Sequence, residues 1–361
     1  AGLSDTEPGL NQNGRGAKGY ADAILVYLAF GLSRLADISN AHCNWSRSAN
    51  QAVHLFGRQA IPMVWDFAET GLFSNKAGDY RTSLKSVIKA IKRFLPRADG
   101  IQIQHDAQAV SYAENTVIST DPPYYDNINY ADLSDFFYPW LKKTLGNVYP
   151  DLFSLLATPK EEELVASIYR HKSKSDAEDH FLMGMKSVIK NMAISPANKY
   201  PIALYYAFKQ SEVQEEGISS TGWSTFLEAV IGSGYKITGT WPVRTERDTG
   251  LKVGMNVLSN SVVIVCRRRS EEADKITRGE FVRLLKNEMP IAIKNLQKSN
   301  IAPADMPQSA IGPGMSIFSR YSSILEADDN PMTVKTALQL INNILDEFLN
   351  KLQGDFDPET R

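Results

Sequence analysis

Apolar residues recur at intervals of three and four between residue 20 and about residue 97, which is the spacing of one face of a helix. The stretches that carry this spacing are YADAILVYLAFGLSRLAD and SLKSVIKAIKRFL, so we expect two helices here. The first is the most apolar of the early segments and is predicted to be buried. Between the two helices lies an aromatic-rich segment that Pro62 interrupts.

The pattern changes to alternating strand and helix signals between about residue 101 and residue 269. Runs rich in β-branched and aromatic residues predict strands, and these are IQIQ, TVIST, YPIALYYAF, YKITGTWPV and NSVVIVCRRR. The intervening stretches DAEDHFLMGMKSVIKNMA and TGWSTFLEAVIGSG have helical spacing, and the second ends at Gly234. Strands separated by helices predict an α/β fold with a largely parallel sheet and helices on both faces.

Helical spacing returns after the charged stretch RRRSEEADK, which spans residues 267–275. It continues in RGEFVRLLKNEMPIAIKNLQ, GMSIFSRYSSILEA and TVKTALQLINNILDEFLNKL. We therefore expect three regions: a helical region over residues 1–98, an α/β core over residues 99–269, and a C-terminal helical region over residues 270–361.

The composition is typical of a globular protein with a substantial core. The chain has 361 residues, of which 43% are hydrophobic and 22% are charged, and its net charge is −2. This charge gives no overall basic field, so a nucleic-acid site is expected only as a local patch. The longest early apolar stretch is too short and too interrupted for a membrane span, so we expect no membrane partner.

The two cysteines, Cys43 and Cys266, are far apart and form no CxxC pair. This chain alone therefore predicts no zinc ribbon, and its histidines show no metal-ligand spacing with Cys or Asp. We expect no metal site. The sparing use of cysteine is typical of a reducing compartment and predicts a cytoplasmic protein.

The segment TVISTDPPYYDN joins a predicted strand directly to an acid, two prolines and two tyrosines. Each residue before a proline is held in an extended form, so Asp121 and Pro122 form a stiff arm at the end of the strand. Open α/β sheets bind their ligands beyond the carboxyl ends of the strands, where Asp121 is expected to lie.

Such an arm offers a carboxylate, a rigid carbonyl and an aromatic ring. An exocyclic NH2 group has two donors, which the Asp121 carboxylate and the Pro122 carbonyl could accept together. Tyr124 could stack on the ring that carries the amine, a contact worth about 1–3 kcal/mol. This combination suits an extruded adenine or cytosine. The alternative is a plain turn after a strand, with the tyrosines as packing residues.

The residues DPPY resemble motif IV of the amino-group DNA methyltransferases, which modify adenine N6 or cytosine N4. The longer run DPPYYDNINYADLSDFFYPWL resembles the adenine-specific DNA methylases of the DUF1156 type. Further stretches share this likeness, which covers nearly the whole chain: FGRQAIPMVWDFAE, YYAFKQSE, STGWSTFLEAVI, TGTWPVRTE and IGPGMSIFSRYSSILEAD. The resemblance implies a class I S-adenosylmethionine-dependent, Rossmann-like methyltransferase sheet, with added helical regions at both ends.

The resemblance also implies roles for the motif Asp121, Pro122, Pro123 and Tyr124. Asp121 and the Pro122 carbonyl would bind the target amine, Tyr124 would hold the extruded base, and the amine would attack the methyl of S-adenosylmethionine. DNA is the implied substrate, and partner proteins of a restriction or defence system are a further expectation. By the same likeness Asp106 would lie near the cofactor adenine, although capping of a loop explains this residue equally well.

The chain departs from the family in its glycines. The resemblance calls for a glycine-rich loop after the first strand to hold the cofactor, and none is found in that setting. GRGAKG at residues 14–19 follows no strand and is expected to be a flexible loop; GSG at 232–234 ends a predicted helix, and GPG at 312–314 opens one. We therefore expect the chain to begin downstream of the cofactor loop and to bind S-adenosylmethionine weakly or not at all.

Basic and aromatic clusters offer further candidates. RHKSK at residues 170–174 is favoured as a DNA-facing loop, whereas KAIKRFLPR and RRR fit solvated surfaces. Trp65 and the aromatic run Phe136, Phe137, Tyr138 and Trp140 are expected to be core residues.

Three functions compete. Methylation of adenine N6 in DNA is favoured over cytosine N4. Methylation of another amine, as in rRNA or a protein, is disfavoured because those relatives usually carry Asn where this chain has Asp121. A DNA-binding or assembly subunit that is inactive as this chain remains open because the glycine loop is missing.

Overall fold

The computed structural model describes residues 2, 6–57, 60–61, 63–76, 78–126, 128–195, 199–207, 221–244, 260–298 and 306–353. The chain divides into two compact units. The first unit comprises residues 1–104 and 128–163, and the second comprises residues 105–127 and 164–361. Each unit is described by itself.

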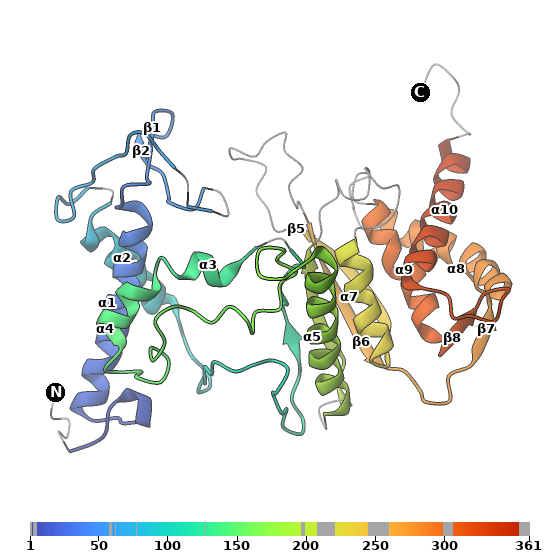
Figure 1. The fold of residues 1–361 in the computed structure, drawn as a ribbon, viewed down its shortest axis with the longest axis horizontal. Coiled ribbons are helices and arrows are strands. Elements are labelled where there is room, and N and C mark those ends of the chain that lie inside the picture. The colour runs from blue at the N-terminus through green and yellow to red at the C-terminus, as the bar shows by residue number, and fades with distance from the viewer. Residues whose placement is uncertain are drawn as a thin grey trace. The chain divides into compact units, whose positions relative to one another are not determined.

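The first unit is mainly helical (Figure 1). Its helix α1 packs against α2 and α4, and a two-residue antiparallel pair, β1 with β2, lies in the connection between α1 and α2. In chain order its elements are η1 (Leu10–Gln12), α1 (Ala17–Ile38), β1 (Trp45–Ser46), β2 (Gln51–Ala52), α2 (Tyr80–Arg93), α3 (Tyr130–Ser134) and α4 (Tyr138–Leu145).

The two helices expected from the apolar spacing are present as α1 and α2. Asp79 caps α2, because its carboxylate accepts hydrogen bonds from the backbone N–H of Arg81 at 2.6 Å and of Asn75 at 2.7 Å. The prediction that the first helix is buried is wrong. Several of its large apolar side chains are exposed: Tyr20, Ile24, Tyr27 and Phe30.

The small core of the first unit explains this exposure. Its buried cluster consists of Ala29, Tyr138, Leu145 and Phe153, which covers one side of α1 only. Trp65, expected in a core, is 95% exposed, so that prediction is also wrong. Of the aromatic run that follows the DPPY segment, Tyr138 is buried, whereas Trp140 is exposed.

The second unit contains a four-stranded mixed sheet with the order β3-β4-β6-β5. Strand β3 pairs with β4 in parallel, and β6 is antiparallel to both β4 and β5. Three strands thus point the same way and β6 is reversed between two of them, which corrects the expectation of a largely parallel sheet. The bounds are β3 (Ser119–Thr120), β4 (Ile202–Ala207), β5 (Tyr235–Arg244) and β6 (Asn260–Arg268).

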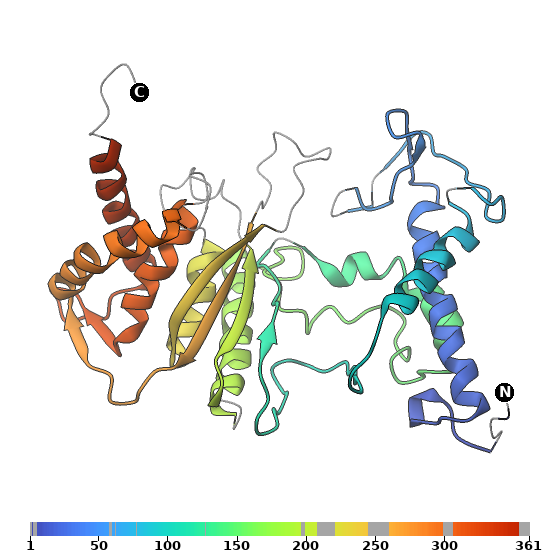
Figure 2. The ribbon, with the colours of Figure 1, turned by 180° about the vertical axis from the view of Figure 1, so that it is seen from behind.

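Helices α5 (Lys174–Ile194) and α7 (Thr221–Gly232) cover one face of this sheet, as the two opposite views show (Figures 1 and 2). Along β4 the buried residues Ile202, Leu204 and Tyr206 alternate with more exposed ones. This period of two belongs to a strand with one packed face. The expectation of helices on both faces is therefore wrong for the described helices.

The C-terminal region packs beside strand β5. The backbone N–H of Ile237 in β5 donates to the Ser319 hydroxyl at 2.9 Å, so α9 satisfies a donor at the sheet edge. Helices α8, α9 and α10 contact one another, and a short parallel pair joins β7 to β8. The bounds are β7 (Lys275–Thr277), α8 (Arg278–Lys298), α9 (Met306–Arg320), β8 (Ser323–Leu325) and α10 (Val334–Gln353).

Two sequence expectations about strands need correction. Residues 101–104, IQIQ, form no strand, and Ile101 and Ile103 are exposed. The strand expected in TVIST is reduced to Ser119–Thr120, because only these two residues pair with β4. Among the described residues, no helix has both the length and the apolar character that crossing a membrane requires.

Candidate functional site

The DPPY segment leaves the sheet at the carboxyl end of β3. Thr120, the last residue of that strand, pairs with Leu204 in the parallel strand β4. Asp121 follows immediately and is exposed, whereas Pro122, Pro123 and Tyr124 are half-buried. The structure thus brings the four motif residues together as an arm at the sheet edge where α/β proteins bind ligands.

The Tyr124 ring is held between the acid and a buried aromatic stack. Its hydroxyl donates to Asp121 Oδ1 at 2.6 Å. Its ring meets Tyr206 edge to face at 5.5 Å between centroids, and Tyr206 stacks on Phe226 of α7 at 4.2 Å. Both Tyr206 and Phe226 are buried. The Tyr124 ring is therefore supported from below by two buried aromatic side chains, Tyr206 and Phe226.

Tyr125, the next residue, anchors the arm from the other side. Its ring meets Phe181 of α5 edge to face at 5.3 Å, and its carbonyl accepts the backbone N–H of Ala166 at 3.0 Å. Gly222 of α7 lies so close that a Cβ there would be 2.8 Å from Tyr125 Cβ. The arm is thus held by α5, by α7 and by the segment around Ala166.

This arrangement leaves hydrogen-bond acceptors available at the sheet edge. Tyr124 occupies one oxygen of Asp121, while Asp121 Oδ2 and the Pro122 carbonyl accept no hydrogen bond from any residue that the structure describes. A carboxylate oxygen and a carbonyl oxygen on one stiff arm can accept two N–H donors of a single amine. The half-buried Tyr124 ring beside them offers an aromatic surface.

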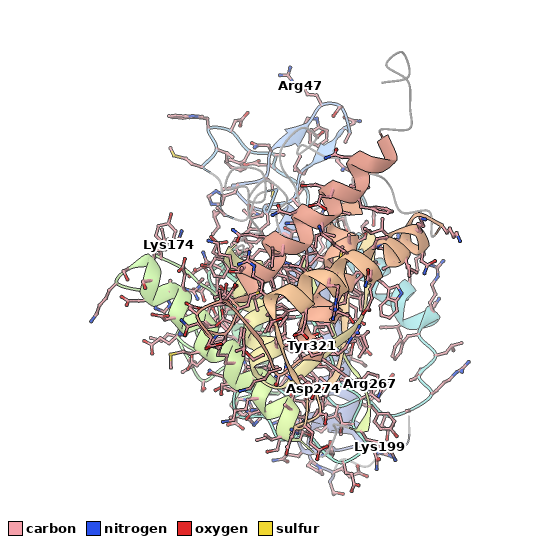
Figure 3. All side chains as sticks on the ribbon, turned by 90° about the vertical axis from the view of Figure 1, so that its right-hand side faces the viewer. Arg47, Lys174, Lys199, Arg267, Asp274 and Tyr321 are labelled. Carbon is pink, nitrogen blue, oxygen red and sulfur yellow. The ribbon has the colours of Figure 1, made fainter. Side chains whose placement is uncertain are left out.

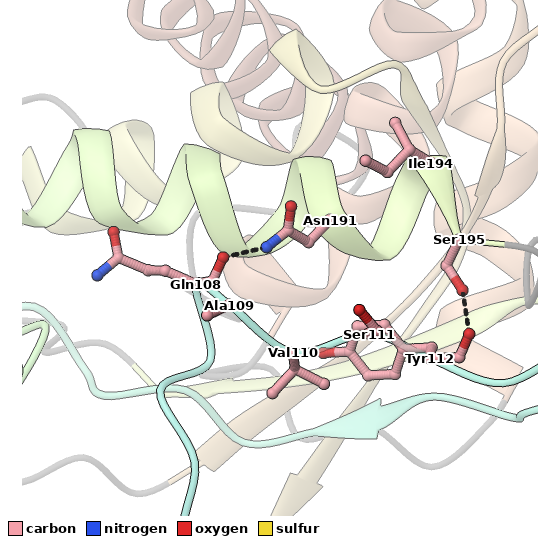
Figure 4. A pocket seen from close by; sticks show the side chains of 8 residues that line it. All are labelled: Gln108, Ala109, Val110, Ser111, Tyr112, Asn191, Ile194 and Ser195. Atoms are coloured by element: carbon pink, nitrogen blue, oxygen red, sulfur yellow. Dashed lines mark hydrogen bonds between the residues drawn. The ribbon is translucent and has the colours of Figure 1, made fainter.

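A cavity of about 390 Å³ lies at a different place in the second unit. It is lined by residues 108–112, which precede β3, and by Asn191, Ile194 and Ser195 at the end of α5 (Figure 4). The Asn191 amide donates to the Gln108 carbonyl, and the Ser195 hydroxyl donates to the Tyr112 carbonyl at 3.5 Å. Among the described residues that line this cavity none has a charged side chain and none belongs to the DPPY arm.

Asp106 lies in the loop that leads to this cavity. Its carboxylate accepts the backbone N–H of Gln108 at 2.9 Å, and its carbonyl accepts the N–H of Ala109 at 3.0 Å. These contacts are those of a residue that closes a turn. The residues that follow Asp106 pack on the last turn of α5, which precedes the start of β4. Asp121, in contrast, follows the carboxyl end of β3, which is parallel to β4. The structure does not bring the two acids together.

The three glycine sequences lie at helices. GRGAKG runs from a turned segment into α1, and its last residues are helical, which corrects the expectation of a flexible loop. Gly232 ends α7, and Gly234 turns the chain with φ of 87°. GPG lies inside α9 rather than at its start. Within the described ranges, then, no glycine-rich loop follows the carboxyl end of a strand.

The basic segment at residues 170–174 leads into α5, and Lys174 is the first residue of that helix (Figure 3). Ala166, four residues before this segment, donates its backbone N–H to the Tyr125 carbonyl, next to the DPPY motif. The two cysteines are buried, and burial raises the pKa of the Cys266 thiol to about 12. Cys266 is therefore protonated at neutral pH.

Sequence reasoning missed the residues that support the arm, namely Gly222, Tyr206 and Phe226. A glycine near the start of a helix, such as Gly222, is a weak signal of a close contact. Nothing in the neighbouring sequence indicates that Gly222 packs against Tyr125, nearly 100 positions earlier.

Parts of the quoted resemblance lie outside the described residues, including residues 208–212 of YYAFKQSE and 245–246 of TGTWPVRTE. No group of three or more His, Cys, Asp or Glu suited to a metal ion occurs in the described part of the chain.

No protein-family model, curated protein or solved structure matches this chain.

Proposed function

We propose that this chain carries the amine-binding site of an amino-group DNA methyltransferase, with adenine N6 as the favoured target. One observation carries the proposal: the Asp121 carboxylate, the Pro122 carbonyl and the Tyr124 ring lie together on one exposed arm. They are the acceptor pair and the stacking surface that an extruded adenine requires.

In the proposed complex the two amine hydrogens point to Asp121 Oδ2 and to the Pro122 carbonyl. Both acceptors draw electron density toward the amine nitrogen and orient its lone pair away from the arm. Asp121 also opposes the positive charge that grows on nitrogen during methyl transfer. The hydrogen bond from Tyr124 fixes the orientation of the carboxylate, so that little reorganisation is needed when the base arrives.

The strand order supports a Rossmann-like methyltransferase sheet. Sheets of that class end with two parallel strands followed by a hairpin whose last strand inserts in reversed direction. The order β3-β4-β6-β5, with β6 antiparallel to both neighbours, agrees with those final four strands. The DPPY arm then follows the first of them, at the carboxyl edge.

S-adenosylmethionine would supply the methyl group in such a reaction. The glycine sequences of the described residues lie at helices and do not form a cofactor loop, so we assign no residue of this chain to hold it. DNA is the proposed macromolecular partner, within a restriction or defence system.

The absence of a cofactor loop among the described residues favours a second candidate function. A subunit that grips a nucleobase amine but leaves the cofactor to another segment or chain would bind DNA without transferring a methyl group by itself. The two candidates share the arm and differ in catalysis.

The test of the first candidate is methyl transfer from labelled S-adenosylmethionine to unmethylated DNA by the full-length protein. We expect label in N6-methyladenine after hydrolysis of the DNA. The variant Asp121→Ala should lower the rate at least ~100-fold, because it removes the group that stabilises the developing charge. Asp126→Ala, which changes an exposed acid two residues beyond the motif, should leave the rate unchanged. A wild-type rate in Asp121→Ala would rule out the proposed role of this acid.

A further inference from the structure

The segment between the DPPY arm and helix α5 contains an unusual turn. The backbone N–H of Arg170 donates to the Ser167 carbonyl at 3.1 Å, which closes a four-residue turn. Its two central residues are Ile168, 54% exposed, and Tyr169, 88% exposed. Turn tips favour Gly, Pro, Asn, Asp and Ser, so an isoleucine and a tyrosine in this position need an explanation.

The turn is attached at both ends to well-packed parts of the second unit. Ala166, just before it, is buried and bonded to the Tyr125 carbonyl of the arm. Ser173, just after it, caps α5 by accepting the N–H of Asp176 at 3.1 Å. Tyr169 is three residues from Ala166, so its Cα lies within about 11 Å of that anchor.

Basic residues follow the exposed tyrosine in the sequence. Arg170, His171 and Lys172 follow it directly, and Lys174 begins α5. Lys174 is paired with Glu178 at 3.8 Å, and the exposed Lys172 lies three residues after Tyr169 in the sequence. An exposed aromatic ring beside lysine and arginine is the combination with which proteins hold unstacked nucleotides.

We propose that this turn is a DNA-inserting element, in which Tyr169 enters the duplex next to the base held by the DPPY arm. The ring stacks on the bases that flank the extruded nucleotide and fills the gap left behind. Arg170 and Lys172 contact the phosphates on either side. The proposal rests on the proposed function for the extruded base that the DPPY arm holds, whereas the exposed ring and the basic residues after it belong to the turn itself.

The test uses a fluorescein-labelled duplex of 25 base pairs with one central abasic site, which offers a ready gap, and the same duplex intact. Binding is measured by fluorescence anisotropy. We expect the wild-type chain to bind the abasic duplex about tenfold more tightly, the effect of one stacking contact. Tyr169→Ala should abolish this preference, and Tyr169→Phe should keep it.

Tyr200→Ala provides the matched control, because Tyr200 is also exposed, lies in the same unit and has a lysine beside it. This variant should keep the preference. Lys172→Ala should leave the preference intact but lower the slope of log binding constant against log salt by about 0.9, the loss of one phosphate contact.

Equal binding of the two duplexes by the wild-type chain would overturn the proposal, as would a preference that survives Tyr169→Ala. Binding to anionic lipid vesicles instead of either duplex, lost in Tyr169→Ala, would also overturn it and would make the turn a membrane contact. Asp121→Ala separates this proposal from the proposed function. An abasic site carries no base, so the preference should persist in that variant even where methyl transfer is lost.

Discussion

The position and orientation of the Asp121 carboxylate are set by the residues next to it. Pro122 and Pro123 hold the backbone extended, so the acid lies at the exposed edge of the sheet. The Tyr124 hydroxyl donates to one carboxylate oxygen at 2.6 Å, and the other oxygen accepts no hydrogen bond from the described residues. Because these effects are local, the sequence was enough to predict that the arm directly follows a strand, with Asp121 at the strand's carboxyl end.

The partners of that arm could not be predicted at the level of single residues. Tyr206 lies under Tyr124, and Gly222 lies against Tyr125. Both contacts join positions separated by more than 80 residues, and only the packing of β4 and α7 brings them together. For Asp106 the sequence left two interpretations open, a place near a cofactor adenine and the capping of a loop, and the structure shows the turn that it closes.

A second acid, Asp135, is predicted to stabilise the first unit in a pH-dependent way. It accepts hydrogen bonds from the Thr158 hydroxyl and from Lys160 Nζ, each at 2.6 Å, and from the Thr158 N–H at 2.9 Å. Burial would raise its pKa, but the hydrogen bonds from Lys160 and Thr158 outweigh this effect and lower the pKa to about 2. Its contribution is therefore complete above the ordinary aspartate pKa of about 4 and is lost as the pH falls through 2.

Asp135→Asn should lower the free energy of unfolding of this unit by about 1 kcal/mol at pH 7, a value reduced for the partial exposure of the pair. The difference should shrink as the pH falls from about 4 through 2 and should vanish only below the lowered pKa of about 2. Urea unfolding at several pH values measures it, with the exposed Asp151→Asn as the control. A difference between wild type and Asp135→Asn that does not change with pH would contradict the assigned cause.

At the scale of elements, α7 sets the position of the arm. This helix supplies Phe226 to the aromatic stack and Gly222 to the contact with Tyr125. The absence of a side chain at Gly222 lets the helix approach the arm closely. Position 222 thus joins a helix of the sheet's packed face to the DPPY arm.

Gly222→Ala should therefore destabilise the second unit although alanine favours helix. The added Cβ would be 2.8 Å from two atoms of Tyr125, Cβ and Cγ. We expect a loss of about 1–3 kcal/mol in the free energy of unfolding, as for overpacked cores, together with weaker DNA binding. Gly232→Ala is the control from the same helix, because its Cβ would meet nothing within 4 Å. It should leave stability unchanged or slightly raised, and equal stability of the two variants would contradict the proposed contact.

Helices were more predictable than strands for a physical reason. The apolar spacing that predicts a helix is contained within each segment, so it was sufficient to predict α1, α2, α5 and α7. Strand pairing depends on distant partners. IQIQ has the right composition but no partner among the described residues, and the reversed direction of β6 follows from its pairing with β4 and β5.

At the scale of the whole molecule, the proposed functions lie in the second unit. The DPPY arm, the turn at residues 167–170 and the mixed sheet all belong to it. The overall charge of −2 gave no sign of DNA binding. The local juxtaposition of an exposed acid, an exposed tyrosine and basic residues within one unit is the basis for expecting it.

The most direct measurement compares how the chain binds two single-stranded 12-mers, one of adenine nucleotides and one of purine nucleotides that lack only the exocyclic amine. We predict that the wild-type chain binds the adenine 12-mer about tenfold more tightly, because a charged and a neutral acceptor both engage the amine. This preference should disappear in Asp121→Ala and persist in Asp126→Ala. Equal affinity of the wild-type chain for the two 12-mers, or a preference that Asp121→Ala retains, would contradict recognition of a nucleobase amine by this arm.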